Sequence, residues 1–212
     1  MVVKLTPMDV IQDAPVIPVI VLDEVTHAVP LAQALVAGGI RMLEVALRTS
    51  ASLACIEAIA NEVPEAVVGA GTVRNTQDAK AAAKAGARFA VSPGYTQAVG
   101  AACKELDLPL LPGVSTASEI MAAQEDGFGA LKFFPAVAAG GVAMLRAWQG
   151  PFGDVKFCPT GGITPVNARD FLALPNVACV GGSWLAPHEV MARGDWKHIT
   201  LLARDAVALK HA

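Results

Sequence analysis

Short apolar runs alternate with alanine-rich stretches along most of the 212-residue chain. The runs are apolar throughout, as expected of strands that are buried on both faces of a parallel sheet. The alanine-rich stretches have apolar residues at helical spacing, and several end in glycine, which is common at helix C-termini. The eight apolar runs cover residues 15–22, 41–47, 66–73, 88–94, 108–114, 130–136, 155–162 and 177–183.

This alternation predicts an α/β fold with a parallel sheet covered by helices. Eight strands that close on themselves form a (β/α)8 TIM barrel, and 212 residues suffice for one small barrel. A helix–glycine–strand unit recurs in "ALVAGGIRMLEV", "AAKAGARFAVSP" and "AQEDGFGALKFFP", and no linker divides the chain. We therefore predict a single barrel domain over residues 1–212, with residues 1–14 as an N-terminal extension. A doubly wound open sheet is the alternative that the pattern leaves open.

Two local signals predict where helices begin. Thr116 and Glu119 in "STASE" have the spacing of a capping box. Pro165 in "ITPVN" is expected at the first position of another helix.

The composition limits the partners of the chain. Apolar residues make up 54% of it, and the formal net charge is −3 without any dense Lys/Arg cluster. This charge argues against nucleic acid or an anionic membrane and favours a small-molecule partner. The longest apolar run, residues 15–22, is too short to span a membrane, and the N-terminus lacks a signal peptide. We expect a cytoplasmic protein.

The cysteines and histidines show no metal-binding spacing. No CxxC, HxH or HExxH motif occurs, and the cysteines are scattered among apolar residues. We therefore expect buried, reduced thiols and neither a protein-held metal nor a cofactor. The four cysteines are Cys55, Cys103, Cys158 and Cys179.

Polar residues at the ends of the predicted strands are the candidates for chemistry. In (β/α)8 barrels the reacting groups lie at the C-terminal ends of the strands, whereas most other strand residues are apolar. The polar residues at these ends are Glu44, Arg48, Thr72, Ser92, Lys132, Thr160 and Ser183.

Lys132 lies within the apolar segment "GALKFFPA". Neighbouring side chains on a strand point to opposite faces, so if Leu131 and Phe133 face the helices, Lys132 and Phe134 face the barrel interior. Apolar surroundings favour the neutral amine, which is a nucleophile for carbonyl groups. A structural salt bridge, or a lysine extending to the barrel rim, is the alternative interpretation.

Glu44 shares the inward face of its strand with Met42 and Ala46. Beside an imine-forming lysine, Glu44 would be a proton shuttle. Taken alone, it is equally consistent with a carboxylate that only pairs with Lys132 or Arg48.

The remaining candidates suit anion binding. Arg48 would lie at the barrel mouth, where a guanidinium binds carboxylate or phosphate. Thr72 and Thr160 could donate hydrogen bonds to a substrate, or only cap a turn. "TGGIT" and "GGS" end the seventh and eighth strands, where such barrels often bind phosphate through backbone N–H groups. Tight turns without a ligand are the alternative for these glycines.

The segments that carry these residues resemble one enzyme family. "GIRMLEVALRT" and "GFGALKFFPAVAAGG" are similar to the two signature segments of the 2-keto-3-deoxy-6-phosphogluconate (KDPG) / 4-hydroxy-2-oxoglutarate (KHG) aldolases. "VGAGTV", "SPG", "CPTGGI" and "CVGGSWL" follow in the order found in that family, so the resemblance covers nearly the whole chain.

The resemblance implies a metal-independent class I (Schiff-base) aldolase of the Entner–Doudoroff pathway, usually a homotrimer. The expected reaction cleaves KDPG, a phosphorylated keto acid, to pyruvate and glyceraldehyde 3-phosphate. KHG, cleaved to pyruvate and glyoxylate, is a further expected substrate.

The resemblance also implies roles for individual residues. Lys132 would form an imine with the substrate C2 carbonyl, and Glu44 would move protons. Arg48 and Thr72 would hold the carboxylate of the substrate. The other residues expected at the substrate are Thr160, Phe134 and Pro93, together with Gly161, Gly162, Gly182 and Ser183 for the phosphate.

One position departs from the family pattern, which usually has Thr where this chain has Ala46. The missing hydroxyl, two residues from Glu44, bears on substrate preference. Three alternatives stay open: a phosphosugar isomerase or epimerase in which Lys132 only binds an anion, a 2-keto-3-deoxy-6-phosphogalactonate aldolase, and a non-catalytic phosphosugar-binding domain.

Overall fold

The computed structural model describes residues 5–209. The strands are β1 (Val16–Ile20), β2 (Met42–Ala46), β3 (Val67–Gly71), β4 (Ala90–Val91), β5 (Leu110–Leu111), β6 (Gly113–Val114), β7 (Ala130–Phe133), β8 (Lys156–Pro159) and β9 (Val180–Gly182). The helices are α1 (Pro7–Gln12), the 3-10 helix η1 (Val25–His27), α2 (Ala28–Ala37), α3 (Ser52–Glu62), α4 (Thr76–Lys84), α5 (Gln97–Glu105), α6 (Ala117–Glu125), α7 (Gly141–Trp148), α8 (Ala168–Leu172), α9 (His188–Ala192) and α10 (Trp196–Ala208).

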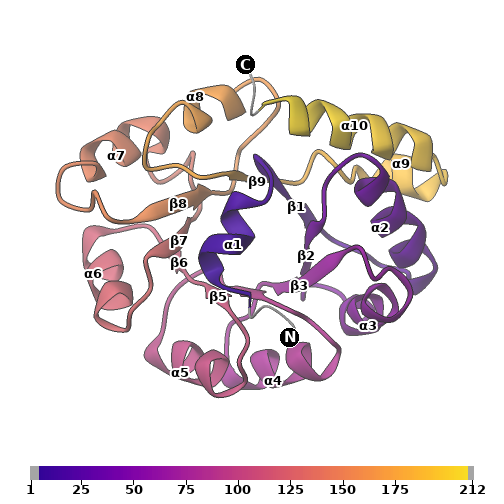
Figure 1. The fold of residues 1–212 in the computed structure, drawn as a ribbon, viewed down its shortest axis with the longest axis horizontal. Helices are drawn as coiled ribbons and strands as arrows, with labels where there is room; N and C mark the ends of the chain where they lie inside the picture. The colour runs from indigo at the N-terminus through magenta and orange to yellow at the C-terminus, as the bar shows by residue number, and fades with distance from the viewer. Residues whose placement is uncertain (1–4, 210–212) are drawn as a thin grey trace.

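The strands form a closed ring surrounded by helices (Figure 1). One sheet has the order β5-β4-β3-β2-β1-β9 and a second the order β6-β7-β8, with every pairing parallel. A parallel bridge between Thr160 and Gly181 joins β8 to β9, and β5 continues into β6 across Pro112. The predicted (β/α)8 barrel is confirmed, and the open doubly wound sheet is excluded because the ring of strands within residues 16–182 has no free edge.

Each of the eight predicted apolar runs supplies one position of the ring. The fifth run is divided into β5 and β6 because Pro112 has no N–H with which to continue the ladder of hydrogen bonds. The carbonyl of Pro112 still accepts a hydrogen bond of 2.8 Å from the Lys132 N–H, so the run stays paired with β7.

Side chains along each strand alternate between two apolar layers. One layer packs outward against the helices and includes Leu43, Val45, Leu131 and Phe133. The other fills the barrel interior, with the residues Ile17, Met42, Val67, Phe89, Val91, Leu111, Ala130, Cys158 and Cys179.

Helix α1 closes the N-terminal end of the barrel. It crosses the centre of the ring of strands in Figure 1, and Val10 and Ile11 are buried in the interior layer. Thr6 caps the helix in a reciprocal capping box with Asp9. Residues 5–14 of the predicted N-terminal extension therefore include a helix that covers the barrel, while residues 1–4 lie outside the described residues.

The two predicted helix starts had different outcomes. The capping box is confirmed, because Glu119 N–H donates to the Thr116 hydroxyl and Thr116 N–H donates to the Glu119 carboxylate. The prediction for Pro165 is wrong, since the helix begins only at Ala168. Asn167 accounts for this, as its side chain accepts from Thr164 N–H and donates to the Gly162 carbonyl, which holds the preceding residues in a turn.

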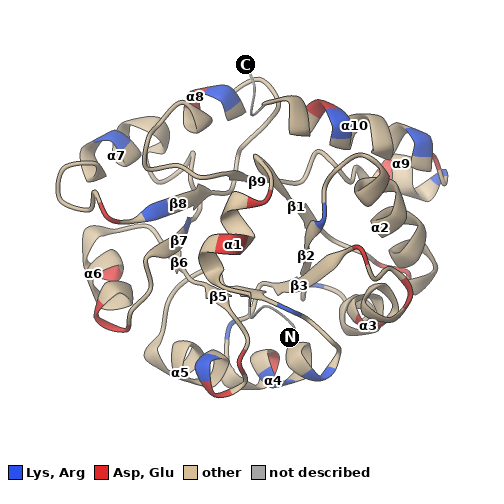
Figure 2. Cartoon of the chain, in the orientation of Figure 1, with Lys and Arg blue, Asp and Glu red and all other residues tan. Residues whose placement is uncertain are grey.

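Charged residues of both signs are interspersed around the outer helices (Figure 2). Among residues 5–209, no helix combines the length and the apolar character needed to cross a membrane.

The packing of α1 gives a stability prediction. Ile11 is fully buried against the interior layer, so Ile11→Ala should lower the free energy of unfolding by about 2 to 5 kcal/mol, through lost burial and the cavity left behind. Urea denaturation measures this change. Met121→Ala is the control, because Met121 is 55% exposed and its truncation should cost less than about 0.5 kcal/mol. Equal effects of the two substitutions would contradict the assignment of α1 to the barrel core.

Candidate active site

A buried ion pair lies in the barrel between two opposite strands. Lys132 Nζ on β7 is 3.1 Å from Glu44 Oε1 on β2, and the two residues are only 4% and 3% exposed. A charge buried this far from water is costly unless it is paired. Lys132 and Glu44 can therefore each be buried only because the other is present. The sequence analysis predicted both as inward-facing, and the structure brings them into direct contact.

The alternation along β7 explains how Lys132 reaches the interior. Leu131 and Phe133 are fully buried in the outward layer, so the lysine between them points inward, as predicted. The Lys132 amine also lies 5.4 Å from the centroid of the Phe134 ring, within the range of a cation–π contact. Phe134 therefore lies at the lysine, where it was expected.

Arg48 and Thr72 meet at the ends of neighbouring strands. Arg48 Nε donates a hydrogen bond of 3.2 Å to the Thr72 hydroxyl. Thr72 has φ = 61°, a left-handed conformation that is strained for a β-branched residue and that clusters at functional sites. The structure thus places together the two side chains predicted to hold a carboxylate.

Ser52 is a supporting residue that the sequence analysis missed. Its buried hydroxyl donates to the Ala46 carbonyl at 2.8 Å and accepts from Thr49 N–H at 3.2 Å. These bonds fix the turn that carries Arg48. No motif marks Ser52 in the sequence, because its role depends on how the turn folds back on the end of β2.

The predicted phosphate-binding residues lie together at the ends of β8 and β9. Gly161 and Gly162 have φ values of 101° and 77°, which glycine adopts without strain. Gly182 ends β9 and the exposed Ser183 follows it, next to the bridge that joins the two strands. Successive backbone N–H groups in such turns form anion-binding concavities.

Thr160 and Pro93 follow the ends of two further strands, β8 and β4. Thr160 is buried beside Gly181, where a Cβ atom would come within 2.2 Å of the Thr160 hydroxyl. Pro93 follows β4 and contacts Gly113, whose register partner on β7 is Lys132. All predicted site residues therefore lie at the C-terminal end of the barrel or just inside it.

Two thiols adjoin the buried carboxylate. Cys158 and Cys179 belong to the interior layer. Burial raises the pKa of the Cys179 thiol, with further contributions from its hydrogen bond with Cys158 and from the charge of Glu44. All four cysteines are unpaired and buried, so the predicted burial of these thiols is confirmed.

Among residues 5–209 no cluster of three His, Cys, Asp or Glu side chains could hold a metal ion.

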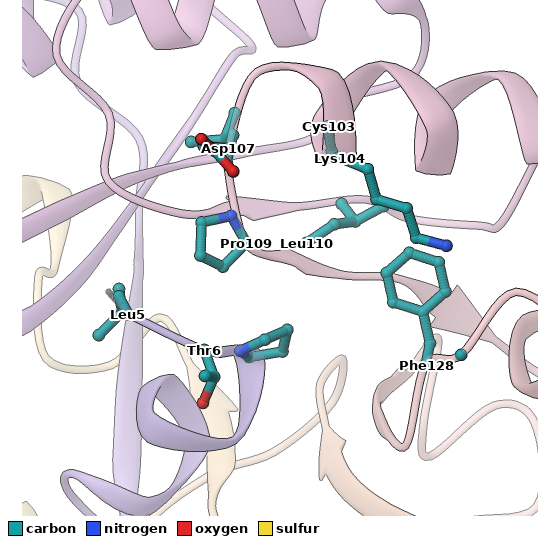
Figure 3. A pocket seen from close by; sticks show the side chains of 11 residues that line it. Leu5, Thr6, Cys103, Lys104, Asp107, Pro109, Leu110 and Phe128 are labelled. Carbon is teal, nitrogen blue, oxygen red and sulfur yellow. The ribbon is translucent and has the colours of Figure 1, made fainter. Parts of the chain in front are cut away.

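A separate cavity lies at the opposite end of the barrel (Figure 3). It has a volume of about 470 Å³ and is lined mostly by apolar side chains between the start of α1 and the segment from α5 to β5. Its lysine, Lys104, lies 5.1 Å from the Phe128 ring centroid and donates to the Asp126 carbonyl. It contains none of the predicted site residues, and we do not assign the reaction to it.

The burial of the thiols gives a chemical prediction. Burial raises the pKa of Cys103 to about 11, so at pH 8 about one molecule in a thousand carries the reactive thiolate. Because all four thiols are also shielded from solvent, a disulfide reagent at pH 8 should leave the cysteines of the folded protein unlabelled over a period in which it labels all four in denaturant. Rapid labelling of the folded protein would contradict the placement of the thiols.

A closed barrel with a buried lysine–glutamate pair, in a chain that matches an aldolase family model, belongs to the class of (β/α)8-barrel aldolases, which are carbon–carbon lyases. The family model described as "Aldolase: KDPG and KHG aldolase" matches residues 8–202. The chain belongs to the KDPG and KHG aldolase family, as the resemblance of its motifs predicted.

Known relatives agree with this assignment over almost the full length. The chain is 53% identical to the KHG/KDPG aldolase of Escherichia coli K12 over 204 residues, which is 96% of each protein. It is also 53% identical to the 2-dehydro-3-deoxy-phosphogluconate aldolase of Pseudoalteromonas atlantica, covering 97% of this chain and 95% of the relative.

Solved structures give the same result. The KDPG aldolase of Legionella pneumophila, with pyruvate captured as a covalent carbinolamine intermediate, has a TM-score of 0.94 and 48% identity, covering 96% of this chain and 99% of that one. The aldolase of Zymomonas mobilis ZM4 with 3-phosphoglycerate has a TM-score of 0.92 and 45% identity, covering 96% of each chain. A structure described as native KDPGal is only 25% identical, with a TM-score of 0.82 and coverage of 93% and 94%.

Proposed function

We propose that this chain is a class I aldolase that cleaves KDPG to pyruvate and glyceraldehyde 3-phosphate through an imine on Lys132. The observation that carries the proposal is the contact of 3.1 Å between the Lys132 amine and the Glu44 carboxylate inside an apolar barrel. An amine in contact with a proton acceptor can be released as the neutral nucleophile. The covalent pyruvate intermediate of the Legionella relative supports the same chemistry here.

Imine formation uses both members of the pair. Glu44 takes a proton from Lys132, and the neutral amine attacks the C2 carbonyl of the substrate to form a carbinolamine. Glu44 then returns a proton to the C2 hydroxyl, which leaves as water and gives the protonated imine. The apolar surroundings favour proton transfer between Glu44 and the reacting groups, because no bulk water competes for the carboxylate.

Bond cleavage uses the imine as an electron sink. Glu44 accepts the proton of the C4 hydroxyl, the C3–C4 electron pair moves toward the iminium nitrogen, and glyceraldehyde 3-phosphate departs. Glu44 then protonates C3 of the remaining enamine, and hydrolysis of the imine releases pyruvate and regenerates Lys132. We propose that the reaction is metal-independent, since the iminium supplies the electron withdrawal.

The remaining residues would hold the two charged ends of the substrate. Arg48 with Thr72 suits the carboxylate, because a guanidinium donates two parallel hydrogen bonds to it. The turns at Gly161, Gly162, Gly182 and Ser183 suit the distal phosphate. Thr160, Phe134 and Pro93 would line the space between them.

We extend the proposal to KHG as a second substrate, because the Escherichia coli relative is named for both. KDPG is favoured as substrate over its galactonate isomer, because the sequence identity of this chain to the Legionella KDPG aldolase is about twice its identity to the KDPGal structure. A homotrimer, a cytoplasmic location and the effect of Ala46 on substrate preference stay predictions.

Replacement of Lys132 tests the imine. Lys132→Ala and Lys132→Arg should both abolish pyruvate release from KDPG, because a guanidinium keeps the charge but cannot form the imine. A coupled assay for pyruvate measures the rate. Substantial activity of Lys132→Arg would instead support an isomerase-like site in which the lysine only binds an anion, and tight binding of KDPG by the wild type without turnover would support a binding domain.

Replacement of Ser183 tests the phosphate site. Ser183→Ala removes one hydrogen bond to a charged group, so KM for KDPG should rise about 10-fold. The exchange of pyruvate methyl protons with solvent is the internal control, because pyruvate has no phosphate and its KM should stay within about twofold. Equal increases in both KM values would show that Ser183 does not bind the phosphate.

A further inference from the structure

Two glycines of β3 face the barrel interior and make room for two different side chains. A Cβ atom at Gly69 would lie 2.5 Å from the Phe89 ring. A Cβ atom at Gly71 would lie 2.3 Å from Glu44 Oε1 and 2.6 Å from Glu44 Cγ. Distances under 3.0 Å essentially never occur for real Cβ atoms, so an alanine at either position would force its neighbour to move.

The direction of the Glu44 side chain depends on this arrangement. In the strand register Glu44 pairs with Gly69, yet its carboxylate lies over Gly71, two residues closer to the barrel mouth. The Phe89 ring occupies the space over Gly69. Glu44 is therefore directed toward Lys132 by an aromatic ring on one side and by the absence of a side chain at position 71 on the other.

Glycine is not needed at position 71 for its backbone. Gly71 is the last residue of β3, in ordinary strand pairing with Ala46, and is not among the glycines with positive φ. Glycine inside a strand usually weakens it, and alanine in the same conformation would reduce the entropy of the unfolded chain. The contact with Glu44 is the feature of the structure that requires the missing Cβ.

We propose that Gly71 is a positioning residue that acts through Glu44: by leaving out a Cβ, it allows the carboxylate to lie against β3 within reach of the Lys132 amine and of a substrate bound there. The proposal rests on the proposed function, because it assigns Gly71 to the proton transfers that Glu44 performs. A displacement of about 1 Å in a group that transfers protons can lower a rate on the order of 100-fold.

Gly71→Ala tests the proposal, with Gly69→Ala as the matched control on the same face of the same strand. In Gly71→Ala the rate at which pyruvate methyl protons exchange with solvent should fall on the order of 100-fold. This exchange requires the Glu44 carboxylate to lie at C3 of the enamine. The final yield of pyruvyl adduct on Lys132 after borohydride reduction should stay at one per chain. Gly69→Ala should lower stability through Phe89 and change the exchange rate of the folded enzyme less than about threefold.

A double-mutant cycle keeps the test decisive if Gly71→Ala folds poorly. In the Glu44→Ala background the space beside position 71 is empty, so Gly71→Ala should cost little or no stability there, whereas Gly69→Ala should cost the same in both backgrounds. Urea denaturation of the six proteins measures the coupling. An undiminished cost of Gly71→Ala in the Glu44→Ala background would overturn the proposal.

The outcomes separate this proposal from the proposed function. If the wild type forms the Lys132 adduct but Gly71→Ala exchanges methyl protons at the wild-type rate, the role of Gly71 is wrong and the aldolase mechanism stands. If the wild type forms no adduct on Lys132, the mechanism itself is wrong.

Discussion

The contact between Lys132 and Glu44 is the constraint on which the rest of the site depends. An ammonium or a carboxylate alone inside an apolar barrel would cost several kcal/mol in lost hydration. Together, at 3.1 Å, each compensates the charge of the other. The pair is therefore both the condition for burying two polar groups and the source of the neutral amine that the proposed reaction needs.

The interior of the barrel is built around this pair. On the side of the N-terminal strand ends, apolar residues exclude water, and α1 closes that end with Val10 and Ile11. The thiols Cys158 and Cys179 lie at the level of the pair, since Cys158 is the register partner of Lys132. At the mouth of the barrel the residues are instead polar or conformationally unusual: Thr72 is strained, Gly161 and Gly162 have positive φ, and Ser183 is exposed. Stability is thus concentrated at one end and reactive groups at the other, as is general for (β/α)8 barrels.

The sequence predicted the parts of this arrangement that depend on periodicity. Eight apolar runs gave the eight positions of the ring, and alternation along "ALKFF" placed Lys132 inside and its neighbours outside. The division of the fifth run at Pro112 and the late start of α8 were not predicted, because they depend on one missing N–H and on the Asn167 side chain. Ser52 and Gly71 could not be found either, since each acts by contacting a residue of another segment of the folded chain.

The central claim is that Lys132 is the residue that binds substrate covalently. Borohydride reduction of the wild-type enzyme in the presence of pyruvate, followed by peptide mass spectrometry, tests it most directly. The account predicts one reduced pyruvyl adduct per chain, located on Lys132, together with loss of aldolase activity. An enzyme that stays active and unmodified, or an adduct located on any other lysine, would contradict it.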